Sequence, residues 1–410
     1  MNEVLSTSKK SIWVATFYAG QIIDPENFEG NPVFGSELAL LEVFSRLGEK
    51  NDVTVFITKP VGYNVIKNNI TWRSEQDWAS LVSTTSPDIL VISRYVGVFC
   101  DYIIPDTTKI YLWVHDIFPH PAYRGKNMAH AFVNNMSRRL SGIITVGDSQ
   151  REEIIMPRYK LDRSLFTTIK NGINLVTPVK PKKNPIMSRA PMSFVYASAP
   201  DRGLVKLLKM WPRILLEWPY ATLQIFHNLS DQDKQAIEKS GLERVAAMGR
   251  VNQKTLFDKL QYIDYWVYPC SFFETCCTTA IEMAFHGPIC ISNDLGALKE
   301  NNNGIIIKND ATERIVTSNV FIPPCPNKKV DNKDVVEKKE SSVTTSPTPP
   351  KPKTEAEIID ENFEEDLFEV LRRLESNPKE KEEIRKNQRE WAKEQTWDAR
   401  AIEWSQLLEL

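Results

Sequence analysis

The segment YWVYPCSFFETCCTTAIEMAFHGPICIS, residues 265–292, decides the fold of this chain. Its first five residues, 265–269, form an apolar run that predicts a short β-strand, and residues 288–292 predict a second strand. Between them, residues 275–285 place apolar side chains at helical spacing and predict an α-helix. Strands that alternate with helices of roughly ten to fifteen residues indicate βα units, so the segment predicts parallel strands in one sheet.

The same alternation continues on both sides of this segment. In the rest of the second half, strands are expected at 193–198, 221–227, 244–248 and 304–307, and helices at 202–217, 231–239 and 252–261. In the first half, strands are expected at 11–18, 52–58, 88–93, 109–115 and 142–146, and helices at 36–47, 75–84, 127–140 and 148–156. Two α/β halves of similar size predict two doubly wound, Rossmann-like domains that face a cleft.

Changes in composition predict where the domains begin and end. A stretch rich in Pro and Lys separates the halves, and a later run of Lys, Glu, Ser, Thr and Pro has too few large apolar residues to form a core. The expected division is an N-terminal domain at 1–176, a linker at 177–191, a C-terminal domain at 192–322, a disordered linker at 323–354 and helices at 355–410. We expect these last helices to pack on both domains through Trp391, Trp397, Trp404 and Leu407–Leu408; a coiled coil is the alternative, although the apolar residues hold no heptad.

Composition excludes several classes of function. The formal net charge is −2 and no basic stripe is present, which argues against a nucleic-acid-binding protein. The longest apolar stretches have the length of a strand, so at most peripheral membrane contact is expected. The first residues show no secretory signal, and the six cysteines form no CxxC pair, which predicts a cytoplasmic protein with reduced thiols.

Two glutamates in the opening segment are the first candidates for chemistry. Glu274 and Glu282 have seven residues between them, and a helix that begins at about Thr275 would place them on nearly the same face. Carboxylates accept hydrogen bonds from vicinal hydroxyls, so the pair suits a sugar and a ribose, and the first helical turn suits a phosphate. Spacing alone favours a simpler interpretation, in which one acid offsets the helix dipole and the other is solvated.

The surrounding residues resemble the signature of family-4 glycosyltransferases. The sequence reads Pro-Cys-Ser-Phe-Phe-Glu at 269–274, then Glu282 and a small apolar run that ends at Gly287. The resemblance implies the two-domain GT-B fold and transfer of a sugar from a nucleotide donor. It implies that Glu274 orients the donor sugar, that Glu282 binds the ribose, and that Thr275 and Cys276 lie at the donor phosphates. The chain departs from the family at Cys277, where Gly is usual beside the phosphate, and at Pro288, one place early.

Other segments resemble the family in the expected order. Gly35 lies in a segment that resembles the N-terminal glycine loop, where the alternative is a plain turn. Arg202 stands where the family has its basic residue for the donor pyrophosphate, after Ser198 in the loop that follows strand 193–198. Lys206 would assist Arg202 or is simply solvated, and Arg250 belongs to a stretch that resembles the loop beneath the base.

His115 and Asp116 end an apolar strand, where the functional residues of α/β proteins usually lie. The family has a His of this kind that touches the donor sugar; a core histidine is the alternative. No other His or Cys stands at ligand spacing, so His115 is not expected to bind a metal. Asp231-Gln232-Asp233 has the form of the motif of metal-dependent transferases, but it opens a helix, where acids cap the N-terminus.

Together these features predict a retaining, metal-independent glycosyltransferase without a cofactor. The resemblance implies that it moves a hexose from a UDP- or GDP-sugar to a hydroxyl of a glycan or glycolipid acceptor. Glu274, His115 and Arg202 are the expected catalytic residues; Gly35, Ser198, Lys206, Arg250, Thr275, Cys276 and Glu282 are expected to bind substrate. Two alternatives stay open, a GT-B-type UDP-sugar epimerase or phosphorylase and an inactive subunit that binds glycan or nucleotide-sugar.

Overall fold

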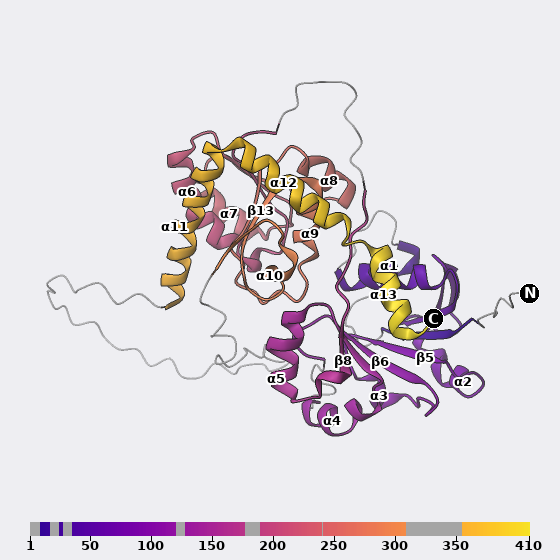
Figure 1. Ribbon diagram of the computed structural model, residues 1–410. Coiled ribbons are helices and arrows are strands. Elements are labelled where there is room, and N and C mark those ends of the chain that lie inside the picture. Colours follow the sequence, from indigo (N-terminus) through magenta and orange to yellow (C-terminus); the bar gives the residue numbers. More distant parts are fainter. Residues whose placement is uncertain are drawn as a thin grey trace, which may run out of the picture.

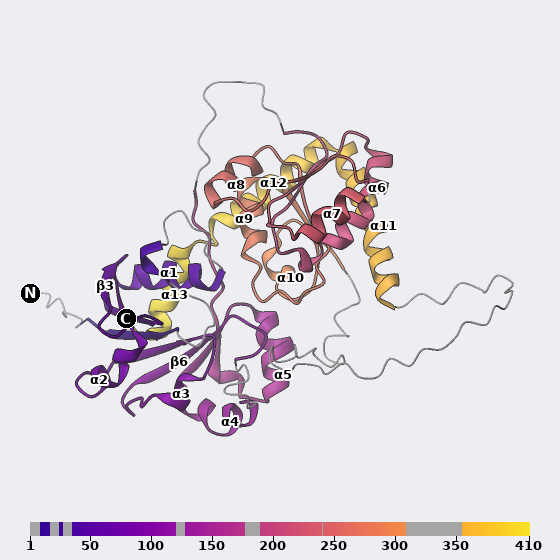
Figure 2. The same cartoon turned by 180° about the vertical axis from the view of Figure 1, so that it is seen from behind.

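The computed structural model describes residues 9–16, 24–27, 35–119, 128–176, 189–239, 241–308 and 355–410. In these residues the chain forms two α/β units and a C-terminal series of helices (Figures 1 and 2). The predicted linker at 323–354 lies outside the described residues, as does most of the one at 177–191. No helix among the described residues is long and apolar enough to cross a membrane.

An eight-stranded sheet forms the first unit, in the order β3-β4-β2-β1-β5-β6-β7-β8. Its pairs are parallel except β3–β4, and the central strand β5 is buried along its whole length because helices cover both faces. The strands are β1 (Ser11–Ala15), β2 (Asp52–Ile57), β3 (Asn64–Lys67), β4 (Ile70–Ser74), β5 (Ile89–Ser93), β6 (Lys109–Val114), β7 (Gly142–Thr145) and β8 (Phe166–Thr168). The helices are α1 (Gly35–Leu47), α2 (Trp78–Val82), α3 (Val98–Asp101), α4 (Ala129–Asn134) and α5 (Met156–Tyr159).

A six-stranded parallel sheet forms the second unit, in the order β11-β10-β9-β12-β13-β14. The strand order reverses between β9 and β12, as in doubly wound nucleotide-binding sheets. The strands are β9 (Ser193–Tyr196), β10 (Thr222–Ile225), β11 (Val245–Ala247), β12 (Tyr265–Tyr268), β13 (Ile289–Asn293) and β14 (Ile305–Ile307). The helices are α6 (Leu204–Glu217), α7 (Asp231–Lys239), α8 (Gln253–Leu260), α9 (Thr278–His286) and α10 (Leu298–Asn301).

Sequence patterns missed the edge hairpin and strand β8. Asn68 and Asn69 join β3 to β4 with φ values of 53° and 61°, which is the two-residue turn that Asn favours. This asparagine pair between two strand-like runs was a readable signal for the hairpin. The helix predicted at 127–140 is interrupted at Asn135, where φ is −122°, and the one at 148–156 begins with a π-helical turn over Gln150–Ile155.

The C-terminal helices join the two units. Helices α11 (Glu355–Ser376) and α12 (Pro378–Lys393) pack on the second unit, whereas α13 (Trp397–Leu408) lies against α1 of the first (Figures 1 and 2). Trp404 packs against Phe44 and Trp113, with ring centroids 5.6 and 4.9 Å apart. The three helices therefore pack as separate elements and not as a coiled coil.

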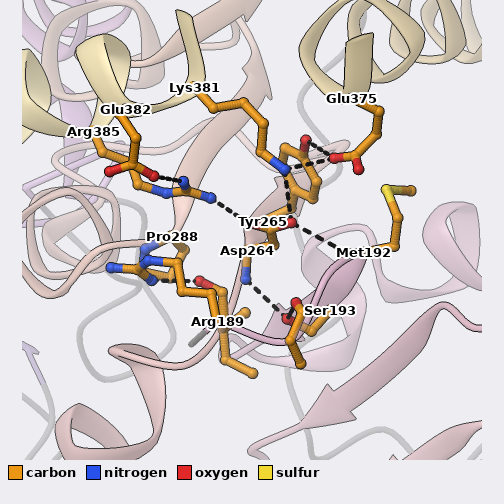
Figure 3. Close-up of polar contacts among 12 residues, drawn as sticks. Arg189, Met192, Ser193, Asp264, Tyr265, Pro288, Glu375, Lys381, Glu382 and Arg385 are labelled. Atoms are coloured by element: carbon orange, nitrogen blue, oxygen red, sulfur yellow. Dashed lines mark hydrogen bonds and ion pairs between the residues drawn. The ribbon is translucent and has the colours of Figure 1, made fainter. Parts of the chain in front are cut away.

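A buried charge cluster fastens α12 to the second sheet. Asp264, which is only 3% exposed, precedes β12 and pairs with Lys381 at 2.8 Å and with Arg385 (Figure 3). Lys381 also pairs with Glu375 at 2.6 Å, and Glu375 accepts a hydrogen bond from the Tyr265 hydroxyl at 2.6 Å. Because two basic side chains converge on one buried carboxylate, the position of α12 depends on Asp264.

Substitution of Asp264 by Ala should therefore destabilise the chain strongly. It removes the most buried counter-charge of Lys381 and Arg385 and leaves them only their pairs with Glu375 and Glu382, and breaking a buried pair in this way costs about 3–5 kcal/mol. The apparent free energy of unfolding in urea, followed by circular dichroism, measures the effect. Lys393→Ala, which breaks an exposed pair with Glu390 on the same helix, is the control and should cause no measurable loss. Equal effects of the two substitutions would show that the buried cluster does not fasten α12.

Candidate functional site

The reversal of strand order in the second sheet brings two loops together. The loop after β9 ends at Gly203, and the loop after β12 begins at Pro269. A Cβ atom on Gly203, whose φ is +127°, would lie 2.4 Å from the carbonyl oxygen of Pro269. The absence of a side chain thus allows the N-terminus of α6 to lie against the end of β12, at the edge where doubly wound sheets bind ligands.

Arg202 and Glu274 meet between these loops. The Arg202 Nη1 atom lies 3.3 Å from Glu274 Oε1, and the same oxygen accepts a hydrogen bond from the Tyr268 hydroxyl at 2.8 Å. The guanidinium carbon of Arg202 lies 3.3 Å from the centroid of the Phe272 ring, which fixes the plane of the guanidinium group. The structure therefore brings together two residues that are 72 positions apart in the sequence and that were expected to act on one donor.

Burial and the neighbouring groups have opposite effects on the pKa of Glu274. Burial raises the pKa of Glu274, while the neighbouring Arg202 and Tyr268 oppose that rise. The Nε atom of Arg202 is buried and has no hydrogen-bond partner among the described residues. A half-buried cation with a buried donor atom that makes no hydrogen bond is suited to bind an anion.

The helix of the opening segment begins later than predicted. Helix α9 starts at Thr278 and not near Thr275, so Glu274 lies in the preceding loop. There its backbone forms an isolated parallel β-bridge with Gly296. The expectation that both glutamates share one helical face was wrong, because residues 275–277 form a turn. Cys277 has a φ of +53°, a left-handed conformation that glycine adopts most easily. This backbone geometry explains why a Gly at this position would fit.

Glu282 follows Glu274 in the chain and lies at the middle of α9. It is half-buried, and its Oε1 atom accepts a hydrogen bond from Gln253 Nε2 at 3.0 Å. Burial raises the pKa of Glu282 to about 7. Gln253 is the first residue of α8, so Glu282 faces the loop that contains Arg250.

The two helix N-termini at the site have no side-chain cap. Gly203 precedes α6 and Cys277 precedes α9, and neither accepts a hydrogen bond from its helix through a side chain. Helix α7 differs, because Ser230 and Asp233 cap it reciprocally, with Asp233 N–H donating to Ser230 Oγ at 3.0 Å. Uncapped N-termini offer N–H groups and a positive dipole end to an anion, whereas Asp233 of α7 serves as a cap.

Thr275 and Cys276 contact the first unit. The Thr275 hydroxyl donates to the carbonyl oxygen of His115 at 2.8 Å, and a Cβ on Gly147 would lie 2.4 Å from the Thr275 carbonyl oxygen. The Cys276 side chain is buried and packs in the apolar cluster of the first unit, where burial raises its pKa to about 11. The thiol of Cys276 thus has a packing role, and only its backbone is left to bind substrate.

His115 is buried at the end of β6, with its ring centroid 4.3 Å from that of Trp113. Burial lowers its pKa to about 3, so the imidazole is neutral at physiological pH. Its Nε2 atom is buried and has no hydrogen-bond partner among the described residues. An orphaned buried nitrogen of this kind is costly unless a ligand supplies its partner.

The structure places the other predicted residues around this centre. Ser198 lies close to Tyr268, whose hydroxyl donates to Glu274. Lys206 is half-buried one turn after Arg202. Arg250 is exposed, and its backbone N–H donates to Asn228 Oδ1 at 2.9 Å. Gly35 begins α1, and a Cβ there would meet no atom within 4 Å, so packing alone does not require glycine.

Sequence analysis missed residues that lie at, or contact, the edge of the first unit. Glu300 accepts hydrogen bonds from the N–H groups of Asp148 and Ser149, at 2.9 and 2.5 Å, and so joins the units; its sequence carried no signal of this contact. Arg94 follows β5 and pairs with Asp116. A charged residue directly after an apolar strand was the signal that could have identified Arg94.

Known proteins support the fold. No family model matches the sequence, and no curated protein sequence matches it significantly. Among solved structures, the chain is similar to sucrose-phosphate synthase from Thermosynechococcus elongatus, with a TM-score of 0.62, 12% identity and 98% of each chain covered. A glycosyltransferase from Rickettsia africae gives the same TM-score, identity and coverage. HepE from Anabaena, in complex with UDP and glucose, has a TM-score of 0.59 and 12% identity, and covers 98% of this chain and 99% of its own. The chain therefore has the GT-B fold, as predicted from its sequence.

Gly296→Ala should disturb the Glu274 loop beyond the ordinary strain of a left-handed alanine. Gly296 has a φ of +60°, and a Cβ there would lie 2.4 Å from the Glu274 carbonyl oxygen. Gly241 has a φ of +63° but no atom within 4 Å of such a Cβ, so Gly241→Ala is a matched control. We expect the control to cost about 1 kcal/mol and Gly296→Ala about 1–3 kcal/mol more, measured by urea unfolding. If both cost the same, the close contact at Gly296 does not constrain the loop.

Proposed function

We propose that the chain is a retaining, metal-independent glycosyltransferase of the family-4 type. It moves a hexose from a UDP- or GDP-sugar to a hydroxyl of a glycan or glycolipid acceptor. The single observation that carries the proposal is the Arg202–Glu274 pair, which lies between two uncapped helix N-termini at the reversal of strand order. Arg202 and the helix N-termini suit a diphosphate, and Glu274 suits the hydroxyls of a sugar.

The remaining residues have complementary roles in this proposal. Glu282, with Gln253 beside it, accepts hydrogen bonds from the ribose hydroxyls. His115 contributes its unpartnered Nε2 atom to the donor sugar from the other unit. Two similar structures support a UDP-linked donor, since HepE was obtained with UDP-glucose and a pneumococcal O-GlcNAc transferase with UDP and GlcNAc.

The proposed chemistry is mainly electrostatic. As the bond between the sugar and the diphosphate lengthens, negative charge grows on the leaving oxygen, and Arg202 with the two helix N-termini stabilises it. Attack by the acceptor hydroxyl on the face of the leaving phosphate preserves the anomeric configuration, and that phosphate takes the hydroxyl proton. Contact between the units at Thr275 and His115 favours exclusion of water and so limits hydrolysis.

A panel of nucleotides and nucleotide-sugars tests the proposal directly. We expect UDP- or GDP-sugars to raise the thermal midpoint of the chain, since a ligand that binds only the folded state stabilises it. Because Arg202 supplies positive charge, the shift and the transfer of sugar should persist in EDTA. No shift with any nucleotide would overturn the proposal. Loss of transfer in EDTA that Mn²⁺ restores would overturn metal independence, and a product that stays on the nucleotide would indicate an epimerase.

Glu282→Gln should weaken the binding of UDP-glucose and remove its dependence on pH. With a pKa raised to about 7, Glu282 is largely protonated at pH 6 and ionised at pH 8, and the ionised form is the stronger acceptor for the ribose hydroxyls. Affinity should therefore increase from pH 6 to pH 8 in the unaltered chain, as measured by calorimetry. The diphosphate of a nucleotide-sugar does not titrate in this range. If the affinity of Glu282→Gln for UDP-glucose depends on pH as it does in the unaltered chain, Glu282 does not bind the ribose.

Arg202→Ala should reduce turnover by about 10²-fold or more, because it removes a cation that faces the charge of the transition state. Lys209→Ala is a suitable control, since Lys209 is an exposed cation on α6, the helix that follows Arg202. The rate of nucleotide release with saturating donor and acceptor measures both variants. Near-normal turnover of Arg202→Ala would show that another residue stabilises the charge on the diphosphate.

A further inference from the structure

The first sheet has its own reversal of strand order, and a second polar cluster lies there. The order reverses between β1 and β5, so α1 and the loop after β5 meet at the carboxyl edge of this sheet. Arg94 follows β5, Glu37 lies in the first turn of α1, and Asp116 follows β6. Three charged residues from separate parts of the chain thus converge on the place where such sheets bind ligands.

Arg94 holds the Asp116 carboxylate in a fixed orientation. Its Nε and Nη2 atoms donate to the two oxygens of Asp116 at 2.9 and 3.1 Å, and its Nη1 atom lies 4.0 Å from Glu37. Arg94 has a φ of +72°, a left-handed conformation that costs a non-glycine residue about 1–2 kcal/mol. Strain of this kind persists where the surroundings determine the position of a residue, often at a functional site.

Asp116 is the exposed member of the cluster. The side chains of Arg94 and Glu37 are 12% and 6% exposed, whereas that of Asp116 is 32% exposed. Buried Gln150 fixes the backbone beneath it by donating to the carbonyl oxygens of Val114 and Asp116, at 3.1 and 2.7 Å. A rigidly held carboxylate that reaches solvent is suited to accept hydrogen bonds from a ligand.

The neighbouring histidine, whose Nε2 atom is proposed to contact the donor sugar, places the cluster beside the donor site. His115 is 92% buried, its Nε2 atom lacks a hydrogen-bond partner among the described residues, and its ring is close enough to interact electrostatically with Asp116 and Arg94. The Thr275 hydroxyl binds the His115 carbonyl, so this cluster lies beside the Glu274 loop of the second unit. A group bound at Asp116 would therefore be next to a sugar held by Glu274.

We propose that Asp116, positioned by Arg94, binds the acceptor, and that the acceptor is an uncharged polyol such as a sugar. This inference rests on the proposed function. Carboxylate oxygens accept hydrogen bonds from hydroxyl groups, and they repel a phosphate or carboxylate on a competing acceptor. Arg94 does not attract such an anion, because Asp116 and Glu37 already surround its guanidinium group. Arg94 is thus a positioning residue, and Asp116 touches the substrate.

Kinetics of Asp116→Asn, with the donor that the nucleotide panel identifies, test this inference. The acceptors are methyl glycosides of glucose, galactose and N-acetylglucosamine, and the phosphates of the same sugars. We expect the unaltered chain to use a neutral glycoside, and Asp116→Asn to raise its KM about tenfold or more. Donor affinity and the slow hydrolysis of donor should not change, which also shows that the variant folds. Arg94→Lys should raise the acceptor KM as well, because lysine keeps the charge but cannot hold both carboxylate oxygens.

Asp106→Asn is the matched control, since Asp106 forms an exposed pair with Arg139 on the same unit. It should leave the acceptor KM unchanged. An unchanged acceptor KM in Asp116→Asn, a parallel loss of donor affinity, or preferential transfer to sugar phosphates would overturn the inference. So would a chain that binds donor but uses none of the neutral glycosides. A chain that binds no nucleotide-sugar at all would instead overturn the proposed function.

Discussion

The loop over residues 269–277 depends on three close backbone approaches that only glycine permits. Gly203 lies against Pro269, Gly296 against Glu274 and Gly147 against Thr275, and a Cβ on any of the three would lie 2.4 Å from a carbonyl oxygen. Two of these glycines belong to the second unit and one to the first. The loop that carries Glu274 is thus held from three sides, and the position of each candidate side chain around it follows from this constraint.

The same loop connects the two units to each other. Thr275 donates to the backbone beside His115, and Cys276 packs in the apolar cluster of the first unit. The C-terminal helices provide a second connection, since α12 is fastened to the second sheet at Asp264 while α13 packs on α1. In the proposed reaction, donor and acceptor groups bound to separate units would therefore meet in a defined geometry.

Individual residues show how far sequence analysis reached. Arg202 and Glu274 were both identified through the family resemblance of the segments around them, and the structure places them 3.3 Å apart. The start of α9 was placed too early, because helical spacing does not reveal that Cys277 adopts a left-handed turn. Cys276 was expected at the phosphates, yet its thiol is buried, since the packing of the other unit decides that exposure.

The sequence by itself determined the alternation of strands and helices, the two doubly wound domains and the residues at the ends of strands, and its resemblance to family-4 glycosyltransferases implied the GT-B fold. These depend on apolar spacing and on residues close together in the chain, which can be read locally. Tertiary structure alone decided that Arg94 orients Asp116, that Glu300 caps backbone N–H groups of the other unit, and that Gly296 lies under Glu274. Those contacts arise because doubly wound sheets bring loops from distant parts of the chain to one edge, and no local pattern specifies which loops meet.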